Sequence, residues 1–300
     1  MDSLDLVKIH FDPKQLEILN LALGFLMFSV SFDIYISDFK TLFSNPKPMF
    51  VGFFSQYVLF PVLTMAMIYM FRPSATVALG FILVSACPSG NMANFMTNHA
   101  RGNLPLSISL NSIITLGAAI STPLVFNFWA QFLPDKSTEI ANIYIGFFDV
   151  VAIIAKVIVL PLVIGLVLRH YFPDFMARIK KTVNVLALVI FFGIIIGAFL
   201  ANWQIARQHL DKIFFLVAFH NAMAMFLGYW AARAARLNLV DSRTIAIESG
   251  IHNTALGMIL VFNFFNGIGG MAMVTAWWGI WDLVAVFSLA SFWRARLVKS

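Results

Sequence analysis

Residues 75–99 read ATVALGFILVSACPSGNMANFMTNH, an apolar stretch with polar residues near its middle. It is long enough to cross a bilayer, because a helical span needs about 20 mostly apolar residues, yet Pro88 and Gly90 interrupt it. A second apolar stretch, residues 243–266, reads RTIAIESGIHNTALGMILVFNFFN and also places Ser-Gly and an amide side chain near its middle. Gly and Pro weaken a helix, and the backbone groups that they free need partners. Two interrupted spans in corresponding halves of a chain indicate a transporter whose binding site lies at the membrane midplane.

The composition excludes an ordinary soluble domain. Of the 300 residues, 60% are hydrophobic and 11% are charged, and the mean hydropathy is +0.86, whereas soluble domains carry about 25% charged residues. So few charges could not cover the surface of a soluble protein of this length. The long apolar runs also lack the alternation of barrel strands. We therefore predict an all-α polytopic membrane protein embedded in a lipid bilayer.

Charged and turn-rich breaks divide the chain into nine predicted transmembrane helices. The connections are short, which leaves no room for a separate soluble domain, so we expect residues 1–300 to form a single transporter domain. The third and eighth helices are the interrupted ones, and their odd separation gives them opposite orientations in the membrane, as an inverted repeat requires. The predicted helices lie near residues 16–36, 48–71, 75–99, 105–130, 140–168, 182–202, 211–235, 243–266 and 270–293.

The basic residues predict the orientation, because cytoplasmic loops carry an excess of Lys and Arg. With the C-terminus inside, 13 of the 20 Lys and Arg residues lie on the inner side and six on the outer side, the remaining one being Lys156 within a span. We therefore expect a multi-pass protein of the plasma membrane, with its N-terminus outside and its C-terminus inside. This bias also accounts for the net charge of +6, and we expect no nucleic-acid partner.

Charged residues inside apolar spans are functional candidates by default. Glu248 lies in the middle of a span and needs a cation, a proton or a hydrogen-bond donor; if the helix continues, Glu248 shares a face with His252 at i, i+4. Lys156 lies on about the same face as Asp149, and it either forms an internal ion pair or extends its amine to the interface. Asp282, near the middle of the last span, suits a structural hydrogen bond as well as substrate or proton handling.

No pattern of catalytic residues accompanies these charges. The six histidines show no zinc-ligand spacing, and the sequence contains no His-Glu-x-x-His, Gly-x-Ser-x-Gly or phosphate-loop motif. The sequence therefore predicts neither an enzyme nor a zinc site.

Four motifs resemble those of the bile acid:sodium symporter family, and the resemblance covers essentially the whole chain. Gln56, five residues before Pro61, and the pair His220-Asn221 also look like the family. The four motifs read Ala86-Cys-Pro-Ser-Gly-Asn-Met-Ala-Asn-Phe-Met-Thr97, Ala100-Arg-Gly-Asn-Leu-Pro-Leu-Ser107, Ser121-Thr-Pro-Leu124 and Ile247-Glu-Ser-Gly-Ile-His-Asn-Thr-Ala-Leu256.

This resemblance implies a secondary active symporter that takes up an organic anion by alternating access. Family members have a panel domain and a core domain, and two broken helices cross at the midplane of the core. Here the panel corresponds to residues of about 16–36 and 140–202, and the core to residues of about 48–130 and 211–293. The chain resembles a nine-span form of the family, and we expect it to be a monomer.

The resemblance also implies sodium as the coupling ion, bound at two sites, and no other metal. For the first site, Asn94, Ser107 and Glu248 match the family's ligands, while Asn111 stands in place of a threonine and Ala93 in place of a serine. Sodium is a hard cation that favours oxygen ligands. Asn111 can supply a carbonyl oxygen in place of the hydroxyl, whereas Ala93 has no side-chain oxygen.

For the second sodium site, Gln56 and Glu248 match, and backbone carbonyls near Ser249 and Ile251 would contribute. His252 stands where the family has a glutamine, and it brings no side-chain oxygen. An unperturbed imidazole titrates near neutrality, so a protonated His252 beside Glu248 could replace the second cation. Two hypotheses follow: coupling to protons, alone or with one sodium, or sodium coupling through the remaining oxygens.

The substrate is expected at the N-terminal ends of the broken half-helices, where backbone N–H groups and helix dipoles favour an anionic group. In this chain these positions are Ser89, Gly90, Asn91 and Met92, with Asn253 from the crossing helix. The resemblance implies a bile acid-like anion or a small carboxylate such as pantoate or pyruvate. A membrane receptor that binds such a ligand without transporting it is the alternative from another functional class.

Overall fold

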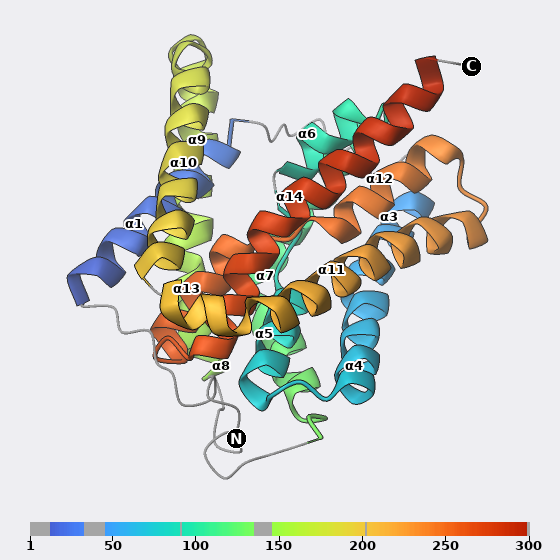
Figure 1. Ribbon diagram of the computed structural model, residues 1–300. Helices are drawn as coiled ribbons and strands as arrows, with labels where there is room; N and C mark the ends of the chain where they lie inside the picture. Colours follow the sequence, from blue (N-terminus) through green and yellow to red (C-terminus); the bar gives the residue numbers. More distant parts are fainter. Residues whose placement is uncertain (1–12, 33–45, 91, 135–145, 202, 299–300) are drawn as a thin grey trace.

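The structure is a computed structural model that describes residues 13–32, 46–90, 92–134, 146–201 and 203–298 (Figure 1). Within these ranges the chain is helical, and the extended pairing is confined to an isolated bridge between Ser89 and His252. Some predicted features lie outside the described residues, namely positions 33–36 and 140–145 of two predicted helices, position 202 and Asn91.

Helices occupy the described parts of the apolar stretches predicted from the sequence. Two of them begin well before the predicted residue, α10 at Pro173 and α11 at Trp203, because helical turns with charged residues precede their apolar parts. The helices are α1 (Pro13–Val30), α3 (Pro46–Phe54), α4 (Phe60–Phe71), α5 (Ala75–Ala86), α6 (Met92–His99), α7 (Leu104–Ala130), α8 (Phe147–Ile154), α9 (Leu160–Tyr171), α10 (Pro173–Ala201), α11 (Trp203–Ala234), α12 (Leu239–Gly250), α13 (Thr254–Phe264) and α14 (Gly269–Val298), with π-helical turns η2 (Ser55–Leu59) and η3 (Ala155–Val159).

Five helical stretches in the described part of the chain are long and apolar enough to cross a membrane. Shorter apolar helices accompany them, because the predicted spans 75–99 and 243–266 are each divided into two pieces. The all-helical membrane fold predicted from the composition is therefore confirmed. The long stretches are Pro46–Phe71, Leu104–Ala130, Phe147–Tyr171, Ile213–Ala234 and Gly269–Arg296, and the shorter ones are Leu16–Val30, Ala75–Ala86 and Thr254–Phe264.

The two interruptions have local causes in the sequence. Helix α5 ends before Cys87, whose backbone is extended (φ −71°, ψ 148°), because the residue before a proline avoids the helical region. Helix α12 ends at Gly250, and Ile251 is extended (φ −118°, ψ 123°). Glu248 and His252 therefore do not share a helix face, which corrects the i, i+4 arrangement expected of an unbroken helix.

Two of the long helices contain a π-helical turn just before a proline. Gln56 lies in η2, which precedes Pro61, and Lys156 lies in η3, which precedes Pro161. Because proline has no N–H group, one hydrogen bond of the regular helix is lost, and a wider turn accommodates the gap.

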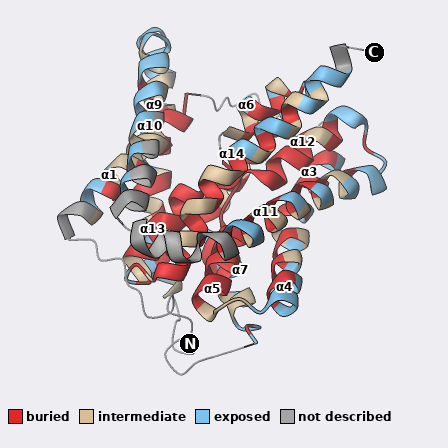
Figure 2. Ribbon diagram, in the orientation of Figure 1, coloured by how far each residue is buried: buried red, intermediate tan, exposed pale blue. Residues whose placement is uncertain are grey.

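The helices form two groups in space. Helices α1, α9 and α10 pack together on one side, and α5, α11, α12 and α14 belong to a larger body beside them (Figure 1). The divided helices form the interior of that body, since α5, α12 and α13 are buried along most of their length (Figure 2). The interruptions thus lie deep inside the larger group, where polar atoms must find partners within the protein.

Candidate functional site

The two interruptions meet at the centre of the molecule and hold each other by backbone hydrogen bonds. The Gly90 N–H donates to the Ile251 carbonyl at 3.2 Å, and the Asn253 N–H donates to the Pro88 carbonyl at 2.8 Å. Ser89 and His252 form the antiparallel bridge between the two strands of extended chain. Groups freed by the breaks therefore satisfy one another in part.

Three amide side chains from other helices satisfy further carbonyls at the breaks. Gln56 donates to the Cys87 carbonyl at 2.9 Å, Asn111 to the Gly90 carbonyl at 2.8 Å, and Asn221 to the Gly250 carbonyl at 2.8 Å. Two of these amides, Gln56 and Asn111, are predicted sodium ligands, and neither forms a hydrogen bond with Glu248. The structure gives them a clear role in holding the breaks in place.

Glu248 is the centre of a hydrogen-bonded group of side-chain oxygens. Its carboxylate is 4% exposed and accepts a hydrogen bond from the Ser89 hydroxyl at 2.5 Å and another from the Ser107 hydroxyl. Ser107 also lies 2.8 Å from the Asn94 amide oxygen. Because a serine hydroxyl has one proton, Ser107 donates to one of these oxygens at a time, which leaves an oxygen-rich group suited to a hard cation.

His252 lies on the other side of the crossing, in aromatic surroundings. Its ring packs 4.5 Å from the Phe60 ring and 5.8 Å from the Trp278 ring, centroid to centroid. Neither ring nitrogen forms a hydrogen bond within the described residues. Its backbone N–H donates to the Asp282 carboxylate at 3.4 Å. The pairing of His252 with Glu248 considered from the sequence is not seen.

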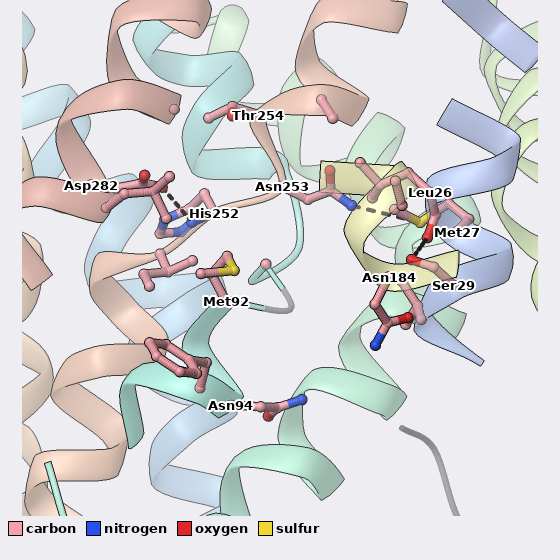
Figure 3. A pocket seen from close by; sticks show the side chains of 18 of the residues that line it. Leu26, Met27, Ser29, Met92, Asn94, Asn184, His252, Asn253, Thr254 and Asp282 are labelled. Atoms are coloured by element: carbon pink, nitrogen blue, oxygen red, sulfur yellow. Dashed lines mark hydrogen bonds between the residues drawn. The ribbon is translucent and has the colours of Figure 1, made fainter. Parts of the chain in front are cut away.

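A cavity of about 710 Å³ lies beside the crossing, between the two groups of helices (Figure 3). Of the predicted substrate residues, Gly90, Met92 and Asn253 line it, whereas Ser89 is engaged with Glu248. The N-terminal ends of α6 and α13 both reach the cavity, so backbone N–H groups and helix dipoles favour an anion there.

The cavity also has lining residues outside the predicted substrate set. Asn98, Asn184 and Lys180 line it, and the sequence singled out none of them. Asp282 lines it as well, and substrate or proton handling was one of the two roles considered for it from the sequence. Asp282 could be recognised in the sequence because it is an acid inside an apolar span. The asparagines and Lys180 could not, because only the packing of α6 and α10 brings them to this cavity.

Oxygen chemistry, rather than nitrogen or sulfur chemistry, characterises the site. The described residues contain no group of three or more His, Cys, Asp or Glu side chains that could hold a metal ion. The carboxylate, hydroxyl and amide oxygens of Glu248, Ser89, Ser107 and Asn94 fit sodium, which prefers oxygen ligands.

Comparisons with known proteins show which proteins the chain is similar to. Residues 20–208 match the profile of the sodium bile acid symporter family. The chain is 30% identical over 281 residues to the "Probable sodium/metabolite cotransporter BASS2, chloroplastic" of Oryza sativa subsp. japonica. The aligned region covers 93% of this chain and 64% of that protein. It is 29% identical over 285 residues to an uncharacterized sodium-dependent transporter of Bacillus subtilis, covering 94% and 84% of the two chains. It is 24% identical over 245 residues to the ileal sodium/bile acid cotransporter of Oryctolagus cuniculus, covering 81% and 69%.

Proposed function

The chain belongs to the sodium bile acid symporter family, and we propose that it couples the uptake of an organic anion to sodium by alternating access. The family consists of transporters and not of enzymes. The chain spans 64% of the length of the rice relative. We therefore base the proposed activity on the residues of this chain and not on the activity of that relative.

The observation that carries the proposal is the group of oxygens around Glu248. An ionised carboxylate buried in an apolar helix needs a compensating charge, and Ser89 and Ser107 supply hydroxyls but no charge. A sodium ion supplies the missing charge and takes the same oxygens as ligands. We assign Glu248, Ser107 and Asn94 to this ion, with Asn111 nearby on α7.

The second sodium ion is assigned to Gln56, Glu248 and the carbonyls near Ser249 and Ile251. His252, which stands next to these carbonyls, is not a source of oxygen ligands. The lack of a hydrogen bond between its ring and Glu248 supports sodium coupling over coupling by a proton shared between these two residues.

The cavity supports a carboxylate as substrate. Its volume of about 710 Å³ lies in the usual range of small-molecule pockets, roughly 300–1,000 Å³. Four asparagines line it and can contact a carboxylate, while most of the other lining side chains are apolar; the lining therefore suits both a small carboxylate, such as pantoate or pyruvate, and a larger anion of the bile acid type. The asparagines are Asn94, Asn98, Asn184 and Asn253.

The architecture proposed with this function has nine membrane-spanning helices in an inverted repeat. The panel comprises residues of about 16–36 and 140–202, and the core comprises residues of about 48–130 and 211–293. The packing of α1 is closer with α9 and α10 than with the helices of the larger body, which supports this division. We propose a plasma-membrane monomer with its N-terminus outside, which follows from the distribution of Lys and Arg.

Uptake into proteoliposomes tests the function directly. An inward sodium gradient should drive accumulation of a carboxylate found by thermal shift across organic acids with and without sodium. Uptake that follows an imposed proton gradient in the absence of sodium, and that is lost in His252→Gln, would instead establish proton coupling. A retained ligand with no counterflow would identify a receptor and contradict the proposal.

A further inference from the structure

Asp282 and His252 form a buried polar pair on the wall of the cavity, and the sodium sites proposed above do not use Asp282. Their side chains are 2% and 3% exposed, respectively, and both residues line the cavity (Figure 3). One carboxylate oxygen of Asp282 accepts the His252 N–H at 3.4 Å. The other oxygen, Oδ1, and both ring nitrogens of His252 have no hydrogen-bond partner within the described residues.

Buried polar atoms without partners call for an explanation, because native proteins pair the large majority of them. Asp282 lies in α14, one of the helices long and apolar enough to cross a membrane, where an uncompensated charge is costly. Only one weak contact, the N–H of His252, reaches its carboxylate from the crossing. A partner that enters the cavity would complete the hydrogen bonding of both side chains.

The position of the substrate's carboxylate limits which chemical group can be the partner of Asp282 and His252. Gly90 and Met92 at the start of α6 and Thr254 at the start of α13 line the same cavity, and helix N-termini attract anions. Thr254 is two residues from His252, whose N–H contacts Asp282. A second negative group near Asp282 is unfavourable, unless the substrate also brings a positive group to this side of the cavity.

We propose that the substrate is a carboxylate that also carries an ammonium group, and that Asp282, with His252, recognises the ammonium. This inference rests on the proposed function, because it places the carboxylate at the helix ends of the proposed substrate site. The ammonium has three N–H donors. Asp282 Oδ1 can accept one of them, and a ring nitrogen of His252, which also has no partner within the described residues, can accept another. A charge-assisted hydrogen bond of this kind is about twice as strong as a neutral one.

The geometry also limits the length of the substrate. The Thr254 N–H donates to the His252 carbonyl at 2.9 Å, so the chain turns tightly between His252 and the first residue of α13. Even two fully extended residues cover at most about 7 Å, which sets the upper limit for this separation. Short ω-amino acids with three or four carbons fit such a separation of charges. On the opposite side of the cavity, Met27, Ser29 and Asn184 (Figure 3) would pack along the substrate's chain. Lys180, one turn before Asn184 on α10, also lines the cavity; its positive charge suits the carboxylate of the substrate, so the ammonium is expected on the Asp282 side.

Matched acids test the proposal on the full-length protein in the presence of sodium. We would measure binding by thermal shift, and competition for uptake in proteoliposomes, for propionate, 3-hydroxypropionate and 3-aminopropionate, and for the corresponding four-carbon acids. The amino acids should bind about tenfold or more tightly than the unsubstituted acids, as expected for a hydrogen bond to a charged group, with the hydroxy acids in between. Equal binding of all three would overturn the proposal and leave Asp282 as a protonated structural residue.

Two variants and a control separate recognition from folding. Asp282→Asn should reduce the preference for the amino acid to about unity and leave the unsubstituted acids bound as before; an unchanged preference overturns the proposal. Asp282→Glu keeps the charge one methylene further along, so the preferred amino acid should become one carbon shorter, an effect that a structural aspartate would not have. Asp174→Asn, on the exposed start of α10, should change nothing.

These measurements also distinguish failure of the ammonium-recognition proposal from failure of the proposed sodium-coupled transport. Sodium-driven uptake of carboxylates without any preference for ammonium would overturn this inference alone. If no acid of either kind is bound or taken up with sodium, the proposed function fails, and the inference fails with it.

Discussion

Glu248 is the residue whose side chain joins the two interrupted helices to α7, through Ser89 and Ser107. Glu248→Gln keeps the size of the side chain but removes its charge and one acceptor. We expect sodium-driven uptake to fall to background and sodium binding to weaken about tenfold or more, since a hydrogen bond to a charged group contributes about 1.5–3 kcal/mol. Thermal shift against sodium concentration and uptake in proteoliposomes measure the two effects.

The matched control for this variant is Glu17→Gln, because Glu17 is exposed on α1. It should transport like the unmodified protein. Helical content by circular dichroism should be the same in both variants, since glutamate and glutamine have similar helix propensities. Normal sodium-driven uptake by Glu248→Gln would contradict the assignment of the site.

The structure does not support the ion pair between Lys156 and Asp149 considered from the sequence, so the prediction for Lys156 changes. Both Lys156 and Asp149 are exposed, and no ion pair joins them in the structure. Lys156→Met therefore removes a charge from an apolar helix, where a lysine is unfavourable by about 2.5–3.5 kcal/mol at the centre of a span. We expect the unfolding temperature to stay the same or to rise, and Lys47→Met near a helix start serves as the comparison; a clear decrease would reveal a stabilising contact of Lys156.

The candidate site was partly predictable at the level of single residues. Asn94, Ser107 and Glu248 come from motifs recognisable in sequence, and the structure brings them together; their binding of sodium stays a prediction. The position of His252 was not predictable from its spacing to Glu248, because the helix ends at Gly250 and turns the following side chains away. Asp282 stood out as an acid in an apolar span, but only the folded chain brings it to His252.

At the scale of elements, the crossing of the two interruptions depends on a close approach at Gly90. A Cβ atom at this position would lie 3.1 Å from Ile251 Cγ2 and 3.2 Å from the His252 carbonyl oxygen. Gly90→Ala should push the two breaks apart, lower stability by roughly 1–3 kcal/mol, as overpacking does, and reduce uptake. Thermal unfolding and uptake measure both, and the variant would contradict this account of the crossing if it transported and unfolded like the parent.

Gly117 in α7 provides the control, because a Cβ atom there would meet nothing within 4 Å. Gly117→Ala should raise stability by about 0.5–1 kcal/mol, the usual gain from removing a glycine inside a helix. The contrast between the two glycines isolates the effect of the crossing from the general effect of helix propensity.

The elements themselves were more predictable than their ends. Apolar length located the helices, and Cys87-Pro88 marked one interruption because a residue before proline leaves the helical region. The starts of α10 and α11 were placed too late, since their first turns carry charged residues that extend a helix without lengthening its apolar part. The π-helical turns around Gln56 and Lys156 follow from the prolines after them, but the hydropathy of the sequence does not predict such turns.

For the molecule as a whole, the proposed alternating access would move the group of α1, α9 and α10 against the larger body. The two groups meet where Asn263 of α13 donates a hydrogen bond to Asn20 of α1 at 3.2 Å, and buried apolar residues of both helices pack together there. A covalent link at this contact should hold the protein in one conformation. Because the chain has a single cysteine, Cys87, a Cys87→Ala background allows Asn20→Cys and Asn263→Cys to be joined by a short bifunctional thiol reagent.

We expect the cross-linked protein to lose sodium-driven uptake almost completely while it still binds sodium and substrate in a thermal shift assay. The loss should require both cysteines, so each single-cysteine variant treated with the same reagent should keep its uptake, as should the untreated double variant. A cleavable reagent should restore transport when it is cut. If the cross-linked protein transports at the rate of the untreated one, α1 and α13 stay together through the cycle, and the division between moving groups must lie elsewhere than between these two helices.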